Sequence, residues 1–314
     1  LADENGNVLF EQNPEQRMYP AELVQIMTAI VVIENIEAVG GWEAEAAYEM
    51  STQNFLYENR HGIISTGMLA GNVFTADQLF HAMVIASGYD AAMTLAKLIA
   101  GSQDAFVELM NAKAAELGAN DTNFTNCHGL HDTANYTTAY DMYLISKHAM
   151  SLDKFRETVS KTAYTCEETD THKKLTWNTD NGLIANGNVH YYSPVTGIKS
   201  GYSAEIGRNV ASYAEFEGFA YYQVNMGAPF ELDEGYNLAL YDAKQLYNWA
   251  FTEFEVKTIV ESGSQIAEVP LELAWQKDHL KLMIGETYRA LLPIDIDVSS
   301  IVYESNLPES VEAP

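Results

Sequence analysis

The chain has 314 residues, of which 17 are basic and 44 acidic, so its formal net charge is 17 − 44 = −27. At roughly one domain per 100–200 residues, this length predicts about two domains. With 47% hydrophobic residues, the composition is typical of a globular protein. The acidic surplus excludes nucleic acid as the default partner, because phosphate binding needs clustered Lys and Arg, and it disfavours anionic membrane surfaces.

The two cysteines, Cys127 and Cys166, are too few for a disulfide scaffold or a Cys-rich zinc module. We interpret them as buried thiols, with pairing in an oxidising compartment as the alternative. The longest apolar run, residues 23–33, contains polar side chains and falls short of the roughly 20 residues that span a membrane. No signal peptide is visible, and the abrupt start at Leu1 favours removal of a targeting segment before this residue.

Helices dominate the predicted elements of the first half. Residues 21–36 are apolar almost all round, which predicts a helix buried in a large core. Thr75 and Gln78 form a capping-box pattern that opens a helix ending near Ile85. The remaining predictions are a short strand at 7–11 and helices at 87–100, at 103–117 and from Thr137 or Thr138 to Met150.

Strands dominate the second half. Short strands are predicted at 161–165 and 171–176, and a longer pair at 206–216 and 219–226 joined by a hairpin at Glu217-Gly218. A helix at 236–254 would cover that sheet. This succession predicts an α+β fold in layers. From residue 255 onwards, short β-leaning segments at 256–261, 268–272, 280–284 and 288–292 predict a small second domain of β structure.

Three segments are candidates for a site: residues 19–29 at the start of the buried helix, Ser87-Gly88-Tyr89-Asp90, and residues 196–203. In this order, together with Asn126-Cys-His-Gly-Leu, Thr138-Ala-Tyr-Asp-Met142 and the Met226-Gly-Ala-Pro turn, they resemble the serine D-alanyl-D-alanine carboxypeptidases, or low-molecular-mass penicillin-binding proteins. The resemblance implies a beta-lactamase/transpeptidase-like fold over residues 1–254, an antiparallel sheet flanked by helices with an inserted helical lobe. It also implies a small C-terminal β domain, whole or in part, over 255–314.

The family's catalytic motifs are altered. In its S-x-x-K motif the serine attacks the peptide carbonyl, and the lysine one helical turn later takes its proton. Here those positions hold Glu22 and Gln25, so the resemblance implies that nucleophile and base are both lost. The second motif, usually Ser-Gly-Asn, reads Ser87-Gly88-Tyr89. The third, K-T-G, is retained as Lys199-Ser200-Gly201 with its hydroxyl intact.

Each altered residue also has a structural interpretation. A carboxylate in the first turn of a helix, as at Glu22, is favoured by the helix dipole; a sharper hypothesis is an ion pair between Glu22 and Lys199. We interpret Ser87 as a helix N-cap. Tyr89 is interpreted as a side chain that fills the groove, rather than as a proton donor.

The residues expected at the substrate-binding site also argue against an active enzyme. Enzymes of this family bind peptides that end in a free carboxylate, for which Ser200, Gly201 and the cation Arg208 are the substrate-binding candidates. The acidic residues Glu231, Asp233 and Glu234 would repel such a substrate if they line the groove. Cys127, His128, His131 and Asp132 resemble a metal cluster only superficially, and neither a metal nor another cofactor is expected.

The resemblance therefore implies a catalytically silent homologue, exported to the extracytoplasmic face of a bacterial membrane or to the cell wall. Its expected role is to bind or scaffold a peptidoglycan peptide or another cell-wall protein. Two alternatives stay open: a serine-type carboxypeptidase with residual or altered activity on peptidoglycan stem peptides, and a purely structural surface protein.

Overall fold

The computed structural model describes residues 1–60, 63–230, 236–273, 278–302, 304 and 306–312. Its backbone divides into two compact units, Leu1–Tyr247 and Asn248–Pro314, so the division lies within the last helix, α8 (Leu238–Glu253). The sequence predicted this boundary further along the chain, at the end of that helix.

A four-stranded antiparallel sheet in the order β1-β8-β7-β6 forms one layer of the first unit. Strands β7 (Gly207–Phe216) and β8 (Phe219–Ala228) form the predicted hairpin, in which Phe216 faces Phe219. Strand β6 (Val195–Ser203), which carries the Lys199-Ser200-Gly201 motif, pairs with β7 at the other edge. The short strand β1 (Ala2–Asp3) pairs with Tyr222 and Tyr221 of β8.

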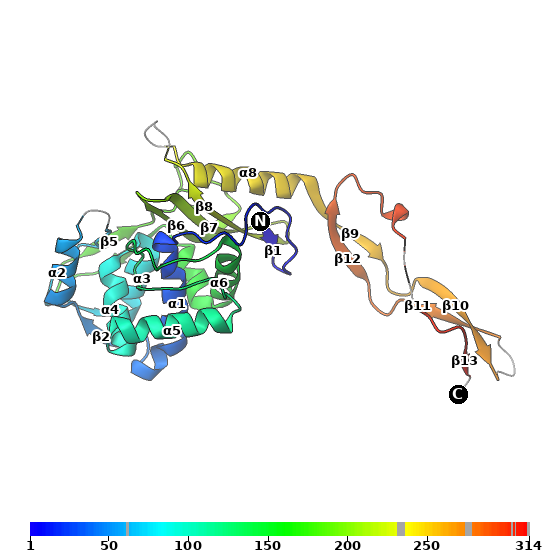
Figure 1. Ribbon diagram of the computed structural model, residues 1–314, viewed down its shortest axis with the longest axis horizontal. Helices are drawn as coiled ribbons and strands as arrows, with labels where there is room; N and C mark the ends of the chain where they lie inside the picture. Colours follow the sequence, from blue (N-terminus) through cyan, green and yellow to red (C-terminus); the bar gives the residue numbers. More distant parts are fainter. Residues whose placement is uncertain (61–62, 231–235, 274–277, 303, 305, 313–314) are drawn as a thin grey trace. The chain divides into compact units, whose positions relative to one another are not determined.

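Helices form the second layer, and α1 (Val24–Asn35) lies at its centre (Figure 1). It follows a short 3-10 helix, Ala21–Leu23, and contacts five other helices because it is apolar on nearly every face. These neighbours are α3 (Ala76–Ala86), α4 (Tyr89–Ala100), α5 (Gln103–Glu116), α6 (Ala139–Ser151) and α7 (Asp153–Val159). Helices α6 and α7 also contact the sheet, so α1 is enclosed between the sheet and the outer helices.

The first part of α8 covers the other face of the sheet (Figure 1). The hydroxyl of Tyr247 lies 2.9 Å from Ser212 Oγ on β7. The inserted helical lobe also includes a 3-10 turn, a further helix and two short antiparallel strand pairs: Ile36–Val39, α2 (Met50–Glu58), β2 (Glu45–Ala47) with β3 (Val73–Thr75), and β4 (Ala163–Cys166) with β5 (Leu175–Asn178). The predicted α+β class is confirmed by this arrangement.

Several predicted caps are confirmed. Thr75 and Gln78 form both bonds of the capping box at the start of α3, at 3.2 and 2.9 Å. Thr138 Oγ1 accepts the N–H of Asp141 and caps α6. The strand predicted at residues 7–11 is wrong, because of that segment only Val8 makes a bridge, to Ala2.

The second unit consists of short paired strands. β9 (Phe254–Val260) pairs with β12 (Tyr288–Pro293), and β10 (Gln265–Glu272) pairs with β11 (His279–Met283) on one side. The two-residue β13 (Val311–Glu312) runs parallel to β10, and Val298–Ser300 forms a 3-10 turn. All four β segments predicted after residue 255 fall on strands β9 to β12.

Candidate functional site

The fold brings the family-equivalent residues to one place, where β6 passes the start of α1 and the α3–α4 junction. Six of them are nine per cent exposed or less: Glu22, Gln25, Ser87, Tyr89, Lys199 and Ser200. These polar and charged side chains are therefore packed within the protein, and position 22 is almost fully shielded from solvent.

Glu22 is held on both carboxylate oxygens. Its Oε1 accepts the hydroxyl proton of Tyr89 at 2.6 Å, and its Oε2 accepts the backbone N–H of Tyr202 at 2.8 Å. Burial raises the pKa of the Glu22 carboxyl, while these two hydrogen bonds and one from its own N–H act in the opposite direction. Tyr89 is thus buried and donates a hydrogen bond to Glu22.

Gln25 binds main-chain carbonyls across the site. Its Nε2 donates to the carbonyl oxygens of Ser87, at 3.1 Å, and His128, at 2.9 Å. Its Oε1 is buried without a hydrogen-bond partner. An amide at this position ties α1 to two loops but offers no group that could accept a proton from a nucleophile at neutral pH.

The ion pair predicted between Glu22 and Lys199 is wrong. The Lys199 ammonium donates instead to the carbonyl oxygens of Met83, at 3.1 Å, and Val84, at 2.9 Å, near the end of α3. Burial lowers the pKa of Lys199, although the charges of Asp180 and Glu22 oppose that shift. The two residues therefore interact through space without a direct contact, because stronger local partners engage each of them.

The N-cap predicted at Ser87 is also wrong. Ser87 ends α3 in the left-handed region, at φ 57°, and the N-cap of α4 is Gly88. The Ser87 hydroxyl donates to the Asp180 carboxylate, and Ser200 Oγ lies 3.5 Å from the Asp180 carbonyl oxygen. The sequence analysis missed Asp180; the only signal was its place in an Asn- and Asp-rich turn shortly before β6.

Arg208 lies one strand away from this cluster. It pairs with Tyr202 across the β6–β7 ladder, and its guanidinium carbon lies 5.2 Å from the centre of the Phe230 ring. Its Nε is buried without a hydrogen-bond partner. The predicted acidic rim, Glu231, Asp233 and Glu234, lies outside the described residues.

His128 is a second residue that sequence reasoning did not place in the site. Its ring stacks on Tyr89 with centroids 5.3 Å apart and lies 5.4 Å from the ring of Phe55. Burial lowers the pKa of His128 to about 4. His128 is therefore a neutral packing partner of Tyr89 rather than a proton carrier.

Within the described ranges, no group of three or more His, Cys, Asp or Glu side chains is placed to hold a metal ion. The ring of His131 packs edge-on against that of Tyr19, with 4.5 Å between the ring centres. His131 and His128 therefore pack against different aromatic rings. Cys127 and Cys166 are buried free thiols.

Gly201 allows Glu22 to approach the sheet. A Cβ at this position would lie 2.6 Å from Glu22 Oε2 and 2.9 Å from the Glu22 backbone nitrogen. We expect Gly201→Ala to lower the free energy of unfolding by about 2 kcal/mol, because backbone as well as side chain must shift. The control is Gly285→Ala, where no atom lies within 4 Å. Equal stability of the two variants, measured by urea unfolding, would contradict this close approach.

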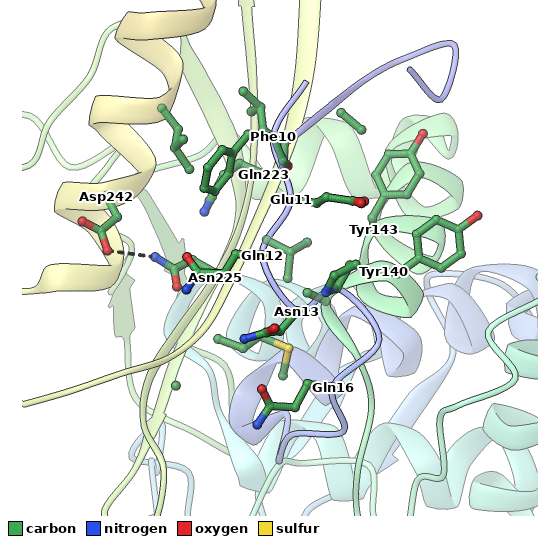
Figure 2. Close-up of a pocket in the computed structure, with 18 of the residues that line it drawn as sticks. Phe10, Glu11, Gln12, Asn13, Gln16, Tyr140, Tyr143, Gln223, Asn225 and Asp242 are labelled. Atoms are coloured by element: carbon green, nitrogen blue, oxygen red, sulfur yellow. Dashed lines mark hydrogen bonds between the residues drawn. The ribbon is translucent and has the colours of Figure 1, made fainter. Parts of the chain in front are cut away.

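A cavity of about 700 Å³ lies elsewhere in the first unit (Figure 2). The N-terminal segment, α6, β8 and α8 line it, with Phe10, Tyr140 and Tyr143 among its aromatic residues. Asn225 Nδ2 donates to Asp242 Oδ2 across it at 3.4 Å. None of the eight residues selected from the sequence lines this cavity, so it is separate from the family-equivalent site.

Known proteins match both the sequence and the fold. The sequence model of the family described as D-alanyl-D-alanine carboxypeptidase matches residues 1–229. D-alanyl-D-alanine carboxypeptidase DacF of Bacillus subtilis is 27% identical over an alignment of 316 positions, which covers 99% of this chain and 76% of that protein. DacA of Escherichia coli is 30% identical over 304 residues, covering 95% and 68%. The crystal structure of penicillin binding protein 5 from Haemophilus influenzae superimposes with a TM-score of 0.75 at 26% identity, covering 100% of this chain and 87% of that one. The chain therefore belongs to the D-alanyl-D-alanine carboxypeptidase family, with the transpeptidase-like fold that its motifs predicted.

Proposed function

We propose that this chain is a catalytically silent member of the family that binds or scaffolds another component of the cell wall. One observation carries the proposal: the positions of nucleophile and base hold Glu22 and Gln25, and both side chains are buried and hydrogen-bonded within the protein. Loss of a serine nucleophile costs a hydrolase roughly 10⁶-fold in turnover. A carboxylate at position 22 cannot form the acyl-serine ester that this chemistry requires.

Glu22 as a general base on water is the remaining route to hydrolysis. Its carboxylate faces Tyr89 and Tyr202 rather than solvent, and it is 1% exposed. A water molecule and a peptide carbonyl would both have to enter beside it. The packing of Tyr89 and His128 over the same position argues against that.

The partner we propose is a peptidoglycan peptide or another cell-wall protein, met on the extracytoplasmic side of a bacterial membrane. The relatives named D-alanyl-D-alanine carboxypeptidase support this setting, since that name describes action on a peptide ending in D-alanine. In the part of the chain that the structure describes, no helix is long and apolar enough to cross a membrane. We further propose that the β segments after residue 255 form a separate C-terminal domain.

Catalytic silence is tested by release of D-alanine from a peptide that ends in D-Ala-D-Ala. We expect the unmodified chain to release no more D-alanine than its Glu22→Ala variant. Release that depends on Glu22 would instead favour the alternative, a working carboxypeptidase with altered residues.

The binding role is tested separately by sedimentation with purified peptidoglycan. We expect enrichment of the chain in the pellet over a control protein of similar acidity. The absence of enrichment would favour a purely structural role or a protein partner over a peptidoglycan ligand.

A further inference from the structure

A backbone N–H and a side-chain hydroxyl converge on the carboxylate of Glu22. The N–H of Tyr202, on β6, donates to Oε2 at 2.8 Å, and the hydroxyl of Tyr89, on α4, donates to Oε1 at 2.6 Å. Fixed donors that point at an oxygen stabilise negative charge on it.

The glycine of the Lys199-Ser200-Gly201 motif makes room for this carboxylate. A Cβ on any other residue at 201 would lie only 2.6 Å from Glu22 Oε2. The oxygen is therefore seated against the backbone of β6 rather than passing over the surface of the strand.

Tyr89 holds the other oxygen of the carboxylate. Its hydroxyl donates to Oε1 at 2.6 Å, and its ring is fixed by stacking on His128. Burial raises the pKa of the Tyr89 hydroxyl, which keeps it a hydrogen-bond donor. The carboxylate thus accepts hydrogen bonds on both oxygens. The two residues that depart from the family motifs, Glu22 and Tyr89, bind each other.

We propose that the backbone N–H of Tyr202 and the Tyr89 hydroxyl form a carboxylate-binding site that the chain's own Glu22 side chain occupies as an internal ligand. The inference rests on the proposed function, because only a residue other than the attacking serine can place a carboxylate there from position 22. A tethered carboxylate excludes a free one, since it loses little translational freedom on binding. The site is therefore blocked as well as lacking its nucleophile.

Removing the internal ligand is expected to open the site to a small carboxylate. We expect sodium acetate to raise the Tm of Glu22→Ala by several degrees in a saturable way at constant pH and ionic strength, because a ligand that binds only the folded state stabilises it. The unmodified chain should respond no more to acetate than to sodium chloride. Acetamide, which has the same shape without the charge, should not stabilise the variant.

Further variants identify the donors. Adding Tyr89→Phe to Glu22→Ala should weaken the acetate response about tenfold in apparent Kd, as expected for loss of one hydrogen bond to a charged group. The matched control adds Tyr143→Phe, which removes a buried hydroxyl from α6. An acetate response that is absent in Glu22→Ala, or equal in the unmodified chain, would overturn the proposal.

A measurement on the unmodified chain covers the case in which Glu22→Ala does not fold. In a pH titration followed by NMR, the amide proton of Tyr202 and the ring protons of Tyr89 should shift together with one midpoint, above the ordinary glutamate value of 4.5. Independent midpoints would contradict a shared carboxylate. These results do not depend on D-alanine release, so failure of the carboxylate site and failure of catalytic silence are separately visible.

Discussion

The triple variant Glu22→Ser, Gln25→Lys, Tyr89→Asn is expected to become covalently labelled by a fluorescent penicillin. The three changes restore the nucleophile, its base and the amide of the second motif, while Lys199, Ser200 and Gly201 are already present. Replacing Glu22 also frees the backbone N–H of Tyr202, a fixed donor of the kind that stabilises a developing oxyanion. Loss of the nucleophile costs a serine hydrolase roughly 10⁶-fold in turnover. We therefore expect the triple variant to be labelled at least about 10³-fold faster than the unmodified chain.

The surroundings of position 25 favour a lysine there. Gln25 Nε2 already lies within hydrogen-bond distance of the carbonyl oxygens of Ser87 and His128. An ammonium group can donate to the same two oxygens, so the substitution creates no buried donor without a partner. Lys199 shows that this protein holds a buried lysine in that way, through the carbonyls of Met83 and Val84.

The matched control carries Ala at position 22 with the same changes at 25 and 89. It should stay unlabelled, because only the serine hydroxyl can form the ester. A fourth change, Asp180→Asn, releases Ser87 from the carboxylate that its hydroxyl now contacts. If the triple and quadruple variants fold as stably as the unmodified chain and neither is labelled, the family scaffold has lost more than these side chains.

We also expect the buried His128 to lower the stability of the folded protein at acidic pH. Burial lowers the pKa of His128 from 6.5 to about 4, and the N–H of Leu130 donates to its Nδ1 at 3.1 Å. A proton on Nδ1 would face that N–H, so the folded protein keeps the ring neutral. The unfolded chain takes up the proton at the ordinary pKa, and stability is therefore lost as the pH falls from about 6.5 towards 4.

The shift corresponds to about 3 kcal/mol, since each pKa unit is worth 1.36 kcal/mol. We expect the free energy of unfolding of His128→Gln to change less with pH than that of the unmodified chain, by up to this amount between pH 7 and pH 4. Other groups titrate equally in both proteins and cancel in the difference. The control is His279→Gln, at a half-exposed side chain of the second unit. Parallel curves for His128→Gln and the unmodified chain would contradict the buried neutral ring.

Local patterns predicted those elements that local interactions define. The capping box at Thr75 and the cap at Thr138 are confirmed, because each depends on residues within one helical turn. The β7–β8 hairpin is confirmed for the same reason, since its two strands are adjacent in the chain. Helix α7 was missed; it is only seven residues long, and tertiary contacts with α6 and β6 hold it.

The candidate site shows where sequence reasoning stops. The motifs identified which residues meet, since the fold of the family fixes their positions. They could not identify which of these residues bind one another. Glu22 contacts Tyr89 and the Tyr202 backbone rather than Lys199, and Ser87 contacts Asp180. Buried polar groups form hydrogen bonds with whichever donor or acceptor lies nearest. Main-chain donors and acceptors, which supply several of these contacts, carry no signal in a sequence.

The most direct test of a closed and silent site is the intact mass of the unmodified chain after incubation with an excess of a β-lactam. The buried carboxylate at position 22 and the amide at position 25 predict a mass equal to that of the untreated protein. A mass increase equal to one β-lactam, located by peptide mapping to residues 19–29 or 87–90, would contradict the loss of acylation chemistry.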